Sequence, residues 1–368
     1  MIRVLVYGIS PVVGGVSEYM MNLFRNIDRK KVSFDFIING DYCEYEKEIN
    51  KLGGKVFYIT PKKVSLIKNI KELSVIFKRC RYTHKIFYFN TSGIYYILPF
   101  LLSKLNKYRI ITHAHNTKCT EMKEYTHILH YLNRIIVRKL SDYRFTCSEL
   151  AGEWVYGTRY YIKNADSIRT INNAVDCIKF KFNKEKRIVN REKLGISEEQ
   201  LVIGNVGRLD YQKNHNFLLE VFYEAVKENS NIILIIIGDG TLKNELIEKA
   251  KKLNISDKVK FLGMRRDIDE LMQVMDIFVL PSFFEGFPIT LVEAQAAGLK
   301  CLVSNTVTKT VALTESVEFN DLNNSAKSWA EKILELDTEK KDNYSTLCQK
   351  GFDIKSQVRE IQELLLKL

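Results

Sequence analysis

Short apolar runs alternate with longer amphipathic segments along the whole chain. In the first half these runs predict β-strands at 2–8, 33–38, 55–60, 85–90, 109–115 and 143–148. The second half repeats the scheme, with strands predicted at 201–209, 232–238, 259–263, 276–281 and 300–304. Between the first two strands, apolar residues recur at helical spacing. Strands that alternate with helices in this way favour parallel sheets covered by helices on both faces.

A polar stretch at about 165–195 separates the two runs of strands. Because a single core rarely keeps growing beyond roughly 250–300 residues, the 368-residue chain is predicted to form two doubly wound, Rossmann-like α/β domains. The last residues, FDIKSQVREIQELLLKL, predict an amphipathic helix. Its polar face carries both signs of charge, which favours docking on protein over binding to a membrane.

The net charge of +12 is concentrated in the first half of the chain. Residues 1–180 hold 29 Lys and Arg against 15 Asp and Glu, whereas residues 181–368 hold 27 against 29. This excess favours an anionic partner, namely nucleic acid, a bilayer surface or a phosphate-bearing acceptor, although solubility alone also accounts for it. The sequence has no zinc-finger spacing, RNP-like motif or basic heptad helix, which argues against nucleic acid.

The sequence predicts a cytoplasmic protein without a metal. Its longest apolar run, at 94–102, is too short to span a bilayer, and the N-terminal residues lack the features of a signal peptide. The seven cysteines never approach C-x-x-C spacing, so we expect neither a zinc site nor a disulfide framework. The six histidines provide no evident set of three metal ligands.

Ligands of doubly wound sheets bind beyond the carboxyl ends of the strands, so the residues after each predicted strand are candidate ligand contacts. Gly14 and Gly15 follow the first strand and precede the first helix, where glycine lets backbone N–H groups approach a phosphate closely. The alternative is a tight strand-to-helix turn, and this motif alone does not decide between the two. The fingerprint G-x-G-x-x-G is absent, which argues against a nicotinamide dehydrogenase.

Three consecutive strand ends in the second half carry glycine or a cation. Arg208 and Lys213 lie in the segment 207–217, where the strand predicted at 201–209 leads into the next helix, and two fixed cations suit a diphosphate. The next two strand ends supply Gly238, Asp239, Gly240, Met264 and Arg265. Taken alone, each loop is explained as a solvated turn with ordinary charges. Together, the three loops favour an anion site.

The segment PSFFEGFPITLVEAQAAG places two carboxylates around a predicted helix start. Pro288 suits the first helical position, and the helix would end near Gly298. Backbone N–H groups from Phe287 to Thr290 are then donors for an anion. Glu285 would repel a phosphate, so we assign it sugar hydroxyls, and Glu293 lies within reach of a ribose diol. The alternative makes both glutamates structural, one at the helix start and one with a buried partner.

His113 and His115 end the strand predicted at 109–115 and face the same side of the sheet. A histidine at this position can donate to a sugar hydroxyl or to developing negative charge. The alternative is a histidine packed inside the strand. This alternative fits His113 better than His115, which is nearer the loop.

Seven segments of the chain resemble retaining glycosyltransferases of family 4: VVGGVSEYMMNL, ITHAHNT, FTCSELAGEWVYG, GNVGRLDYQKNHNFLLEVF, IIGDG, VKFLGMRRDI and PSFFEGFPITLVEAQAAG. The resemblance covers about residues 1–335 and is strongest to bacterial enzymes that build capsular polysaccharide and exopolysaccharide. It implies the GT-B architecture, in which two Rossmann-like domains face each other across a cleft and the last helix crosses back to the first domain. The domains would be 1–175, joined by the helix at about 353–368, and 176–352. The resemblance implies neither a metal nor another cofactor.

The resemblance also implies roles for residues of the donor site. Arg208 and Lys213 would bind the donor diphosphate. Glu285 would contact the transferred sugar and Glu293 the ribose. The other donor-binding residues would be Gly14, Gly15, Gly238, Asp239, Gly240, Met264, Arg265, Gly286, Phe287, Pro288 and Ile289.

In the first domain the resemblance identifies one active-site histidine and shows one departure. His115 matches the family's histidine best, with His113 as the alternative. The segment INNAVD at 171–176 stands where relatives commonly have N-G-[IV]-D. Asn173 tolerates a positive φ better than most residues, so the turn is expected to be kept. The segment NTVTKTVALTESVEF after Ser304 matches the family only loosely.

The function implied by the resemblance is retaining transfer of a sugar from a nucleotide-sugar, with UDP as the expected nucleotide. The acceptor would be a hydroxyl of a polyprenyl-diphosphate-linked saccharide. The basic first half would then bind the anionic inner leaflet and hold the protein at the membrane periphery. The rival functions are a GT-B sugar-nucleotide epimerase or phosphorylase and a catalytically silent GT-B partner. A silent partner should have lost the cations or the glutamate pair, and all are present.

Overall fold

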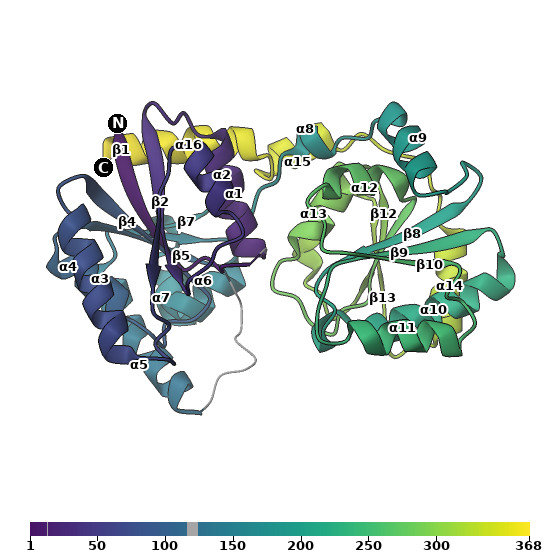
Figure 1. Ribbon diagram of the computed structural model, residues 1–368, viewed down its shortest axis with the longest axis horizontal. Coiled ribbons are helices and arrows are strands. Elements are labelled where there is room, and N and C mark those ends of the chain that lie inside the picture. The colour runs from purple at the N-terminus through teal and green to yellow at the C-terminus, as the bar shows by residue number, and fades with distance from the viewer. Residues whose placement is uncertain (13, 116–123) are drawn as a thin grey trace. The chain divides into compact units, whose positions relative to one another are not determined.

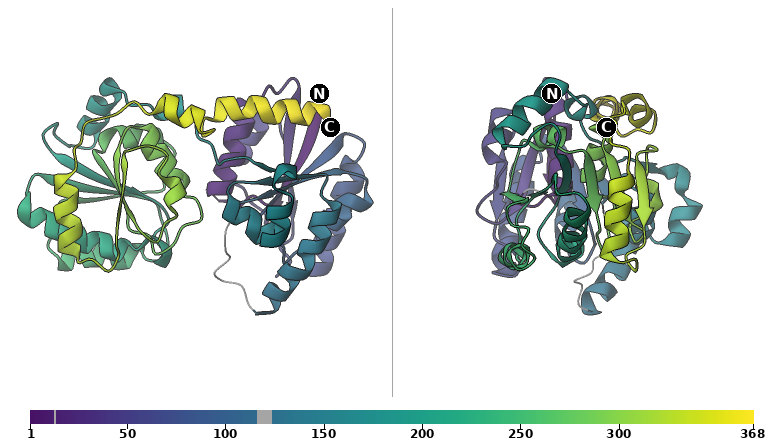
Figure 2. Two further views of the ribbon diagram at one scale, coloured as in Figure 1. Left: turned by 180° about the vertical axis from the view of Figure 1, so that it is seen from behind. Right: turned by 90° about the vertical axis from the view of Figure 1, so that its right-hand side faces the viewer.

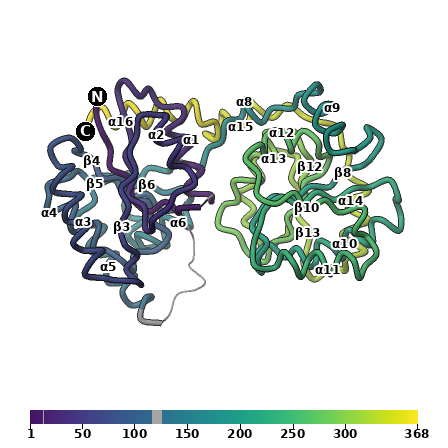
Figure 3. The backbone as a smooth tube through the Cα atoms, in the orientation of Figure 1, coloured from purple at the N-terminus to yellow at the C-terminus, as the bar shows by residue number. Residues whose placement is uncertain are grey.

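The computed structural model describes residues 1–12, 14–115 and 124–368. The chain divides into two compact units (Figure 1). Met1–Ala174 and Ile354–Leu368 form the first unit, and Val175–Asp353 forms the second. The backbone therefore enters the second unit once and returns from it once, as the colours of the trace show (Figure 3).

The first unit is built on a seven-stranded sheet in the order β3-β2-β1-β4-β5-β6-β7, with every pair of neighbours parallel. Its strands are β1 (Ile2–Tyr7), β2 (Val32–Asn39), β3 (Val56–Ile59), β4 (His84–Thr91), β5 (Arg109–Ala114), β6 (Tyr143–Thr146) and β7 (Ile168–Thr170). The order reverses direction between β1 and β4. This reversal is the topological switch point at which doubly wound sheets bind ligands.

Helices cover both faces of this first sheet. They are α1 (Gly15–Asn26), α2 (Glu46–Lys51), α3 (Leu66–Cys80), α4 (Leu98–Leu105), α5 (Glu124–Leu140), α6 (Glu149–Tyr156), α7 (Thr158–Lys163), η1 (Ala165–Ser167) and α16 (Ile354–Lys367). Helices α3 to α6 share one hydrophobic core with the sheet. On the other face Phe24 of α1 packs between Phe34 and Phe36 of β2. The C-terminal helix α16 contacts α1 and β2 with its apolar side.

The second unit repeats the plan with a six-stranded parallel sheet in the order β10-β9-β8-β11-β12-β13. Its strands are β8 (Leu201–Val206), β9 (Ile232–Ile237), β10 (Val259–Gly263), β11 (Ile277–Leu280), β12 (Lys300–Ser304) and β13 (Val317–Asn320). The switch point of this sheet lies between β8 and β11. The repetition of the strand–helix scheme seen in the sequence therefore extends to the strand order of the two sheets.

The helices of the second unit also form two layers (Figure 2). Helices α10, α11 and α14 share one core with the sheet, whereas α12 and α13 lie on the other face. The elements are α8 (Cys177–Phe180), α9 (Lys184–Lys193), η2 (Tyr211–Lys213), α10 (His215–Glu228), α11 (Lys243–Lys252), α12 (Ile268–Val274), α13 (Ile289–Ala296), η3 (Lys309–Val311), α14 (Ala326–Glu335) and α15 (Tyr344–Gln349).

The predicted doubly wound fold is confirmed, and each strand predicted from an apolar run is present. Two strands were not predicted, namely β7 and β13, which form one edge of each sheet. The stretch at about 165–195, predicted only as a polar separator, contains β7, α8 and α9. Within the described ranges, no helix combines the length and apolar character needed to cross a bilayer.

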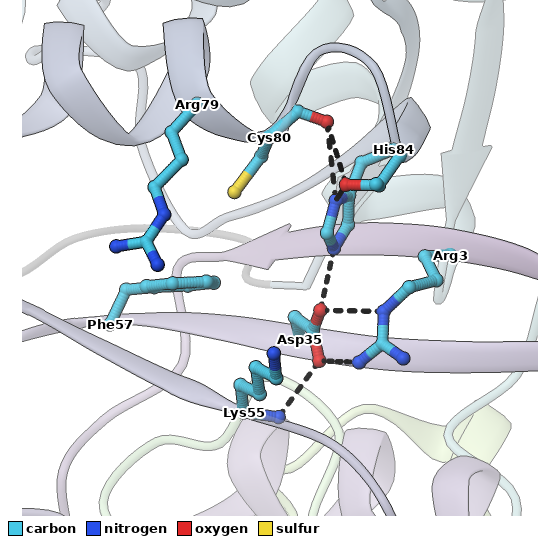
Figure 4. Close-up of a pocket in the computed structure, with 8 residues that line it drawn as sticks. Arg3, Asp35, Lys55, Phe57, Arg79, Cys80 and His84 are labelled. Carbon is cyan, nitrogen blue, oxygen red and sulfur yellow. Dashed lines mark hydrogen bonds and ion pairs between the residues drawn. The ribbon is translucent and has the colours of Figure 1, made fainter.

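A buried carboxylate joins three strands of the first sheet (Figure 4). Asp35 of β2 accepts hydrogen bonds from Arg3 Nε of β1 at 2.9 Å, from the Lys55 backbone N–H at 2.8 Å and from His84 Nε2 of β4 at 2.6 Å. Burial alone would raise the pKa of Asp35, but the hydrogen bonds and charges of His84 and Arg3 outweigh it and hold this pKa below its usual value. The carboxylate thus stabilises the fold in its charged form.

Asp35→Asn is expected to lower the free energy of unfolding by about 3 kcal/mol near neutral pH, because it leaves buried donors facing a neutral group. A depressed folded-state pKa stabilises the fold above the unfolded pKa of about 3.9, and that contribution is lost as the pH falls through the folded pKa. The difference between wild type and variant should therefore shrink in acid below about pH 4. Urea denaturation at two pH values measures it.

The control for this prediction is Glu360→Gln, which removes a half-exposed ion pair with Arg169 at 3.3 Å in the same unit. Exposed pairs of this kind contribute about 0–1 kcal/mol. Equal losses of stability in the two variants would show that Asp35 has no special role in the sheet.

Candidate active site

The predicted donor residues of the second unit gather at the switch point of its sheet. Arg208 and Lys213 lie between β8 and α10, and Glu285 lies between β11 and α13. Because β8 and β11 are neighbouring parallel strands, their carboxyl ends bring these two connections together. The residues are separated by more than seventy positions in the sequence and meet only through this topology.

Lys213 and Glu285 form a largely buried ion pair. Lys213 Nζ lies 2.7 Å from Glu285 Oε1, and the two side chains are 14% and 7% exposed. Ser282 Oγ donates to the same oxygen at 2.7 Å, and Gln212 Nε2 donates to Glu285 Oε2 at 3.1 Å. A buried pair contributes little net stability, because desolvation offsets the attraction. Because net stability does not account for this pair, we interpret it as a functional group whose carboxylate is held by Ser282 and Gln212.

The two connections that carry this pair are bonded to each other along their length. The Phe283 backbone N–H donates to Gln212 O at 2.9 Å, and Gln212 Nε2 donates to Phe284 O at 2.9 Å. The rings of Tyr211 and Phe283 stack with their centroids 4.7 Å apart. The Glu285 carboxylate is thus fixed by its own loop and by the neighbouring one.

Helix α13 begins one residue later than predicted. Pro288 is its N-cap, with an extended ψ of 107°, and Ile289 is the first helical residue. The expectation of Pro288 at the first helical position is therefore wrong, and a proline, which lacks an N–H, is tolerated at either position. Gly298 follows the helix with a φ of +71°. Glu293 lies on the buried side of α13 and is 7% exposed.

Glycines bring the connections after β8 and β9 into close contact. A Cβ at Gly238, whose φ is +140°, would lie 1.9 Å from Gly207 O, and one at Gly240 would lie 2.4 Å from Leu209 O. Both positions therefore exclude any larger residue. The side chain of Asp239 accepts from Gly240 N–H at 2.8 Å and pairs with Lys243 at 2.9 Å.

The remaining predicted donor residues of this unit are more exposed. Arg208 has a side chain that is 75% exposed, with Asp210 at 3.5 Å. Met264 and Arg265 follow β10, where Arg265 Nε donates to Asp267 at 2.8 Å. Phe287 stacks on Phe352, with ring centroids 5.4 Å apart, and Gly286 precedes it in the loop. Arg208 thus supplies a cation open to solvent in the same connection as Lys213.

In the first unit, Gly14 is the N-cap of α1 and Gly15 its first residue. Gly14 is extended, with a φ of −172°, which any residue adopts. The turn is held by Ser17 Oγ, which accepts from Ser10 N–H at 2.9 Å. Residue 13 lies outside the described ranges. The glycine pair therefore stands at the start of a helix beside the switch point of the first sheet.

His115 follows β5 and is oriented by two asparagines. Its Nε2 lies 2.7 Å from Asn90 Oδ1, and its Nδ1 lies 3.3 Å from Asn173 Oδ1. Asn90 Nδ2 donates to Tyr7 O at 3.2 Å, which turns the Asn90 oxygen toward the ring. Both ring nitrogens of His115 thus face the side-chain oxygen of an asparagine.

His113 is fully buried in β5, and its Nδ1 bonds to Tyr88 OH at 2.9 Å. The two imidazole rings lie with centroids 3.9 Å apart. Burial lowers the pKa of His113 well below 6.5, and His115 lowers it further. Burial also lowers the pKa of His115 to about 3, although its bond to Asn173 acts in the opposite direction. Both rings are therefore neutral at physiological pH.

His115 is expected to remain neutral from about pH 8 down to about pH 5, whereas an unperturbed histidine titrates near pH 6.5. Side-chain NMR of imidazole nitrogens measures this, with the His115→Asn spectrum identifying the signal. The same chain in urea serves as control, because its histidines should titrate near the unperturbed value. A transition of the His115 signal near pH 6.5 in the folded protein would contradict the assigned environment.

One sequence-based expectation about Asn173 is wrong. The residue was expected to keep a turn by adopting a positive φ, but Asn173 is not among the described residues with positive φ. It instead directs its side chain toward His115. Ala174, which stands where the relatives' motif has glycine, also has no positive φ, so this segment is kept without a left-handed residue.

Sequence reasoning missed Gln212, Ser282 and Asn90. The first two hold Glu285, and the third orients His115. Asn90 ends a predicted strand next to that of His115, so the rule that ligands bind at carboxyl ends could have found it. No comparable signal marks Gln212, because glutamine in a polar loop is unremarkable in sequence.

Two cavities in the molecule are not lined by the candidate site residues. One of about 410 Å³ lies beside Asp35, and one of about 590 Å³ is lined by residues of the second unit that include Glu315, Lys341 and Lys350. The described part of the chain has no group of three or more His, Cys, Asp or Glu side chains that could hold a metal ion. The assignment of the site therefore rests on switch-point geometry and not on cavity size.

Two Rossmann-like units of this strand order place the protein in the GT-B class. A family profile described as "Glycosyl transferases group 1" matches residues 186–350. The putative glycosyltransferase EpsF of Bacillus subtilis is 30% identical over 359 residues, which cover 94% of this chain and 91% of EpsF. The chain therefore belongs to this glycosyltransferase family, and the resemblance seen in the sequence is confirmed.

Two further relatives extend the comparison. The UDP-Gal:alpha-D-GlcNAc-diphosphoundecaprenol alpha-1,3-galactosyltransferase of Escherichia coli is 24% identical over 97% of this chain and 95% of its own. The crystal structure of HepE from Anabaena in complex with UDP-glucose superposes with a TM-score of 0.80 at 18% identity, and both chains are covered completely. At that identity the likeness to HepE concerns the fold alone.

Proposed function

We propose that this glycosyltransferase moves a sugar from a UDP-sugar to a hydroxyl of a polyprenyl-diphosphate-linked saccharide, with retention of the anomeric configuration. The observation that carries the proposal is the buried Lys213–Glu285 pair at the switch point of the second sheet. Support comes from the printed name of the E. coli relative, whose substrates are UDP-Gal and a diphosphoundecaprenol saccharide. HepE, which shares the fold, was crystallised with UDP-glucose. The product would serve capsule or exopolysaccharide assembly.

The proposed chemistry breaks the bond between the anomeric carbon and the oxygen of the β-phosphate. The acceptor hydroxyl attacks from the same face, and its proton passes to the departing phosphate. Negative charge therefore grows on the diphosphate, and preorganised positive charge lowers the barrier. Arg208, Lys213 and the N–H groups at the start of α13 supply that charge. These groups take the place of a metal ion in the proposal.

Each carboxylate has its own target in this proposal. Glu285 binds hydroxyls of the transferred sugar, and Glu293 binds the ribose diol. Gly286, Phe287, Pro288 and Ile289 shape the turn that presents the backbone N–H groups to the diphosphate. Gly238, Asp239, Gly240, Met264 and Arg265 complete the nucleotide side. His115 contributes a neutral imidazole at the carboxyl edge of the first sheet.

The experiment is a transfer assay with radiolabelled UDP-galactose, UDP-glucose and UDP-N-acetylglucosamine and a lipid extract from bacterial membranes as acceptor. Label should enter the lipid fraction from one donor, EDTA should not stop transfer, and NMR of the product should show a retained anomeric configuration. Glu285→Ala should abolish transfer, whereas Glu331→Ala, an exposed pair partner of Lys327, should not. Conversion of a donor without lipid would instead identify an epimerase.

We also propose that the protein binds the inner face of the membrane through α5. Ile128, Tyr131, Leu132 and Ile135 are 51–60% exposed and recur at helical spacing along one side of this helix. The sequence of α5 contains Arg134, Arg138 and Lys139 and a single acid, Glu124, at its start. An apolar stripe on a basic helix suits an anionic lipid surface.

The triple variant Ile128→Ser, Leu132→Ser, Ile135→Ser is expected to lose most of its co-sedimentation with phosphatidylglycerol vesicles. The loss should be at least about five-fold, because each buried CH2 contributes about 0.8 kcal/mol to membrane binding. Leu105→Ser is the control, since Leu105 is 78% exposed on another helix of the same unit. Equal binding of wild type to neutral and anionic vesicles would contradict the proposal.

A further inference from the structure

A lysine of the first unit lies over the rings of two consecutive tyrosines at the carboxyl edge of the sheet. Lys62 lies in the turn after β3, and Tyr95 and Tyr96 follow β4. Lys62 Nζ is 4.6 Å from the centroid of each ring. This edge is also the one at which His115 follows β5. The ammonium group is therefore fixed on the side of the sheet where ligands bind.

Buried hydrogen bonds keep this arrangement in place. Tyr96 OH donates to Asn69 Oδ1, and Asn69, which is fully buried in α3, donates to Thr60 O at 2.6 Å. Thr60 N–H in turn donates to Glu72 at 2.6 Å. The Tyr96 ring is thus anchored through α3 to the end of β3. A side chain with this support is preorganised and does not lose much freedom when a ligand binds.

The surroundings of Lys62 are positive and apolar. Residues 62–81 hold seven Lys and Arg against a single acid, Glu72. The Glu72 carboxylate accepts a hydrogen bond from Thr60 N–H and lies 3.9 Å from Lys68 Nζ. Within the described ranges, Lys62 makes no ion pair with a carboxylate. Val64 and Ile67 beside it are 75% and 70% exposed.

The two rings attract the charge of the Lys62 ammonium group but do not accept all of its hydrogen bonds. A cation over an aromatic face is attracted by the ring quadrupole, but its three N–H donors still need acceptors. Burial lowers the pKa of Lys62 below 10.5, and the neighbouring Lys63 adds to this shift. An anion bound to Lys62 would accept hydrogen bonds from its N–H groups and would favour its charged form. Exposed Val64 and Ile67 offer contacts to a hydrocarbon chain attached to that anion.

We propose that Lys62, with Tyr95 and Tyr96, binds the diphosphate of the polyprenyl-linked acceptor, while Val64 and Ile67 contact the first units of its prenyl chain. The inference rests on the proposed function, since it locates the acceptor of that reaction. It assigns the diphosphate to the connections after β3 and β4. The acceptor saccharide then extends along the carboxyl edge toward the position after β5.

The test uses farnesyl diphosphate as the probe, titrated by calorimetry into the full chain in the presence of saturating UDP, which occupies the donor diphosphate site. Lys62→Ala is expected to weaken binding at least ten-fold, and Tyr95→Leu to weaken it by a similar factor. Lys63→Ala, which removes a neighbouring exposed charge without ring contacts, should change the affinity less than three-fold. Farnesol, which lacks the diphosphate, should not bind measurably.

Three results would overturn the inference: no binding of farnesyl diphosphate by the wild type, equal weakening by Lys62→Ala and Lys63→Ala, or an equally large effect of Lys62→Ala on binding to phosphatidylglycerol vesicles. The last result would assign Lys62 to a lipid headgroup. The UDP titration that precedes each run tests the donor site separately. Failure of UDP to bind, with Lys62-dependent binding of the probe intact, would refute the proposed donor and leave this site standing.

Discussion

Lys213→Ala is expected to lower kcat for sugar transfer by about 100- to 1,000-fold, as removal of one preorganised charge-stabilising group typically does. Lys213 is held by the Glu285 carboxylate at 2.7 Å and is only 14% exposed, so its charge acts where water screens it little. In the proposed reaction the departing diphosphate gains charge in the transition state. The loss should therefore fall on kcat more than on KM for the donor.

Two control variants distinguish an effect of the lost Lys213 charge from an effect of unfolding. Lys327→Ala removes an exposed lysine of the same unit, 3.8 Å from Glu331, and should leave kcat unchanged. Lys213→Arg keeps the charge and should retain more activity than the alanine variant. Thermal unfolding of each variant shows whether the second unit stays folded. A fall in kcat of less than about ten-fold in folded Lys213→Ala would remove this residue from the mechanism.

Glu285→Gln is expected to lower kcat/KM for the donor by about 100-fold. The amide keeps the shape of the side chain but loses the charge that accepts from Lys213, Ser282 and Gln212. In the variant, the hydrogen bonds that residue 285 is proposed to accept from sugar hydroxyls are no longer strengthened by a negative charge. Steady-state kinetics with saturating acceptor measures the change.

Comparison of two ligands distinguishes the proposed role of Glu285 from a structural one. If Glu285 binds the sugar, the affinity for the UDP-sugar should fall in Glu285→Gln, whereas the affinity for UDP should stay within about three-fold. A carboxylate near a diphosphate repels it, so UDP binding has no reason to weaken. Equal losses for both ligands would mean that Glu285 acts only by holding Lys213.

The fold could be predicted from the sequence because buried parallel strands produce uninterrupted apolar runs. The strand β9, IILIII, is buried along its whole length and leaves an unambiguous pattern. The edge strands β7 and β13 are only three and four residues long, and most of their residues are not fully buried. Their pairing with a neighbour, and not their own composition, makes them strands.

The candidate site could be predicted in part. Rules about strand ends and helix starts pointed to Lys213, Glu285 and His115, since each follows a strand at the carboxyl edge. The direct pairing of Lys213 with Glu285 could not be predicted, because it requires β8 and β11 to be neighbours. Gln212 bonds to Glu285 and to the backbone of the neighbouring loop, a role that depends on that same adjacency.

Asn173 illustrates a different limit of sequence reasoning. A comparison of residue types suggested that its backbone would replace a glycine turn. The structure shows that its side chain, 3.3 Å from His115 Nδ1, makes the important contact. Backbone preference is a property of one residue, whereas this contact depends on residues 58 positions apart.

The most direct test of the account is a crystal structure of the protein with UDP bound. We expect the diphosphate against Arg208, Lys213 and the start of α13, with the ribose hydroxyls at Glu293. UDP bound elsewhere in the second unit, or a diphosphate that contacts neither Lys213 nor the start of α13, would contradict the account.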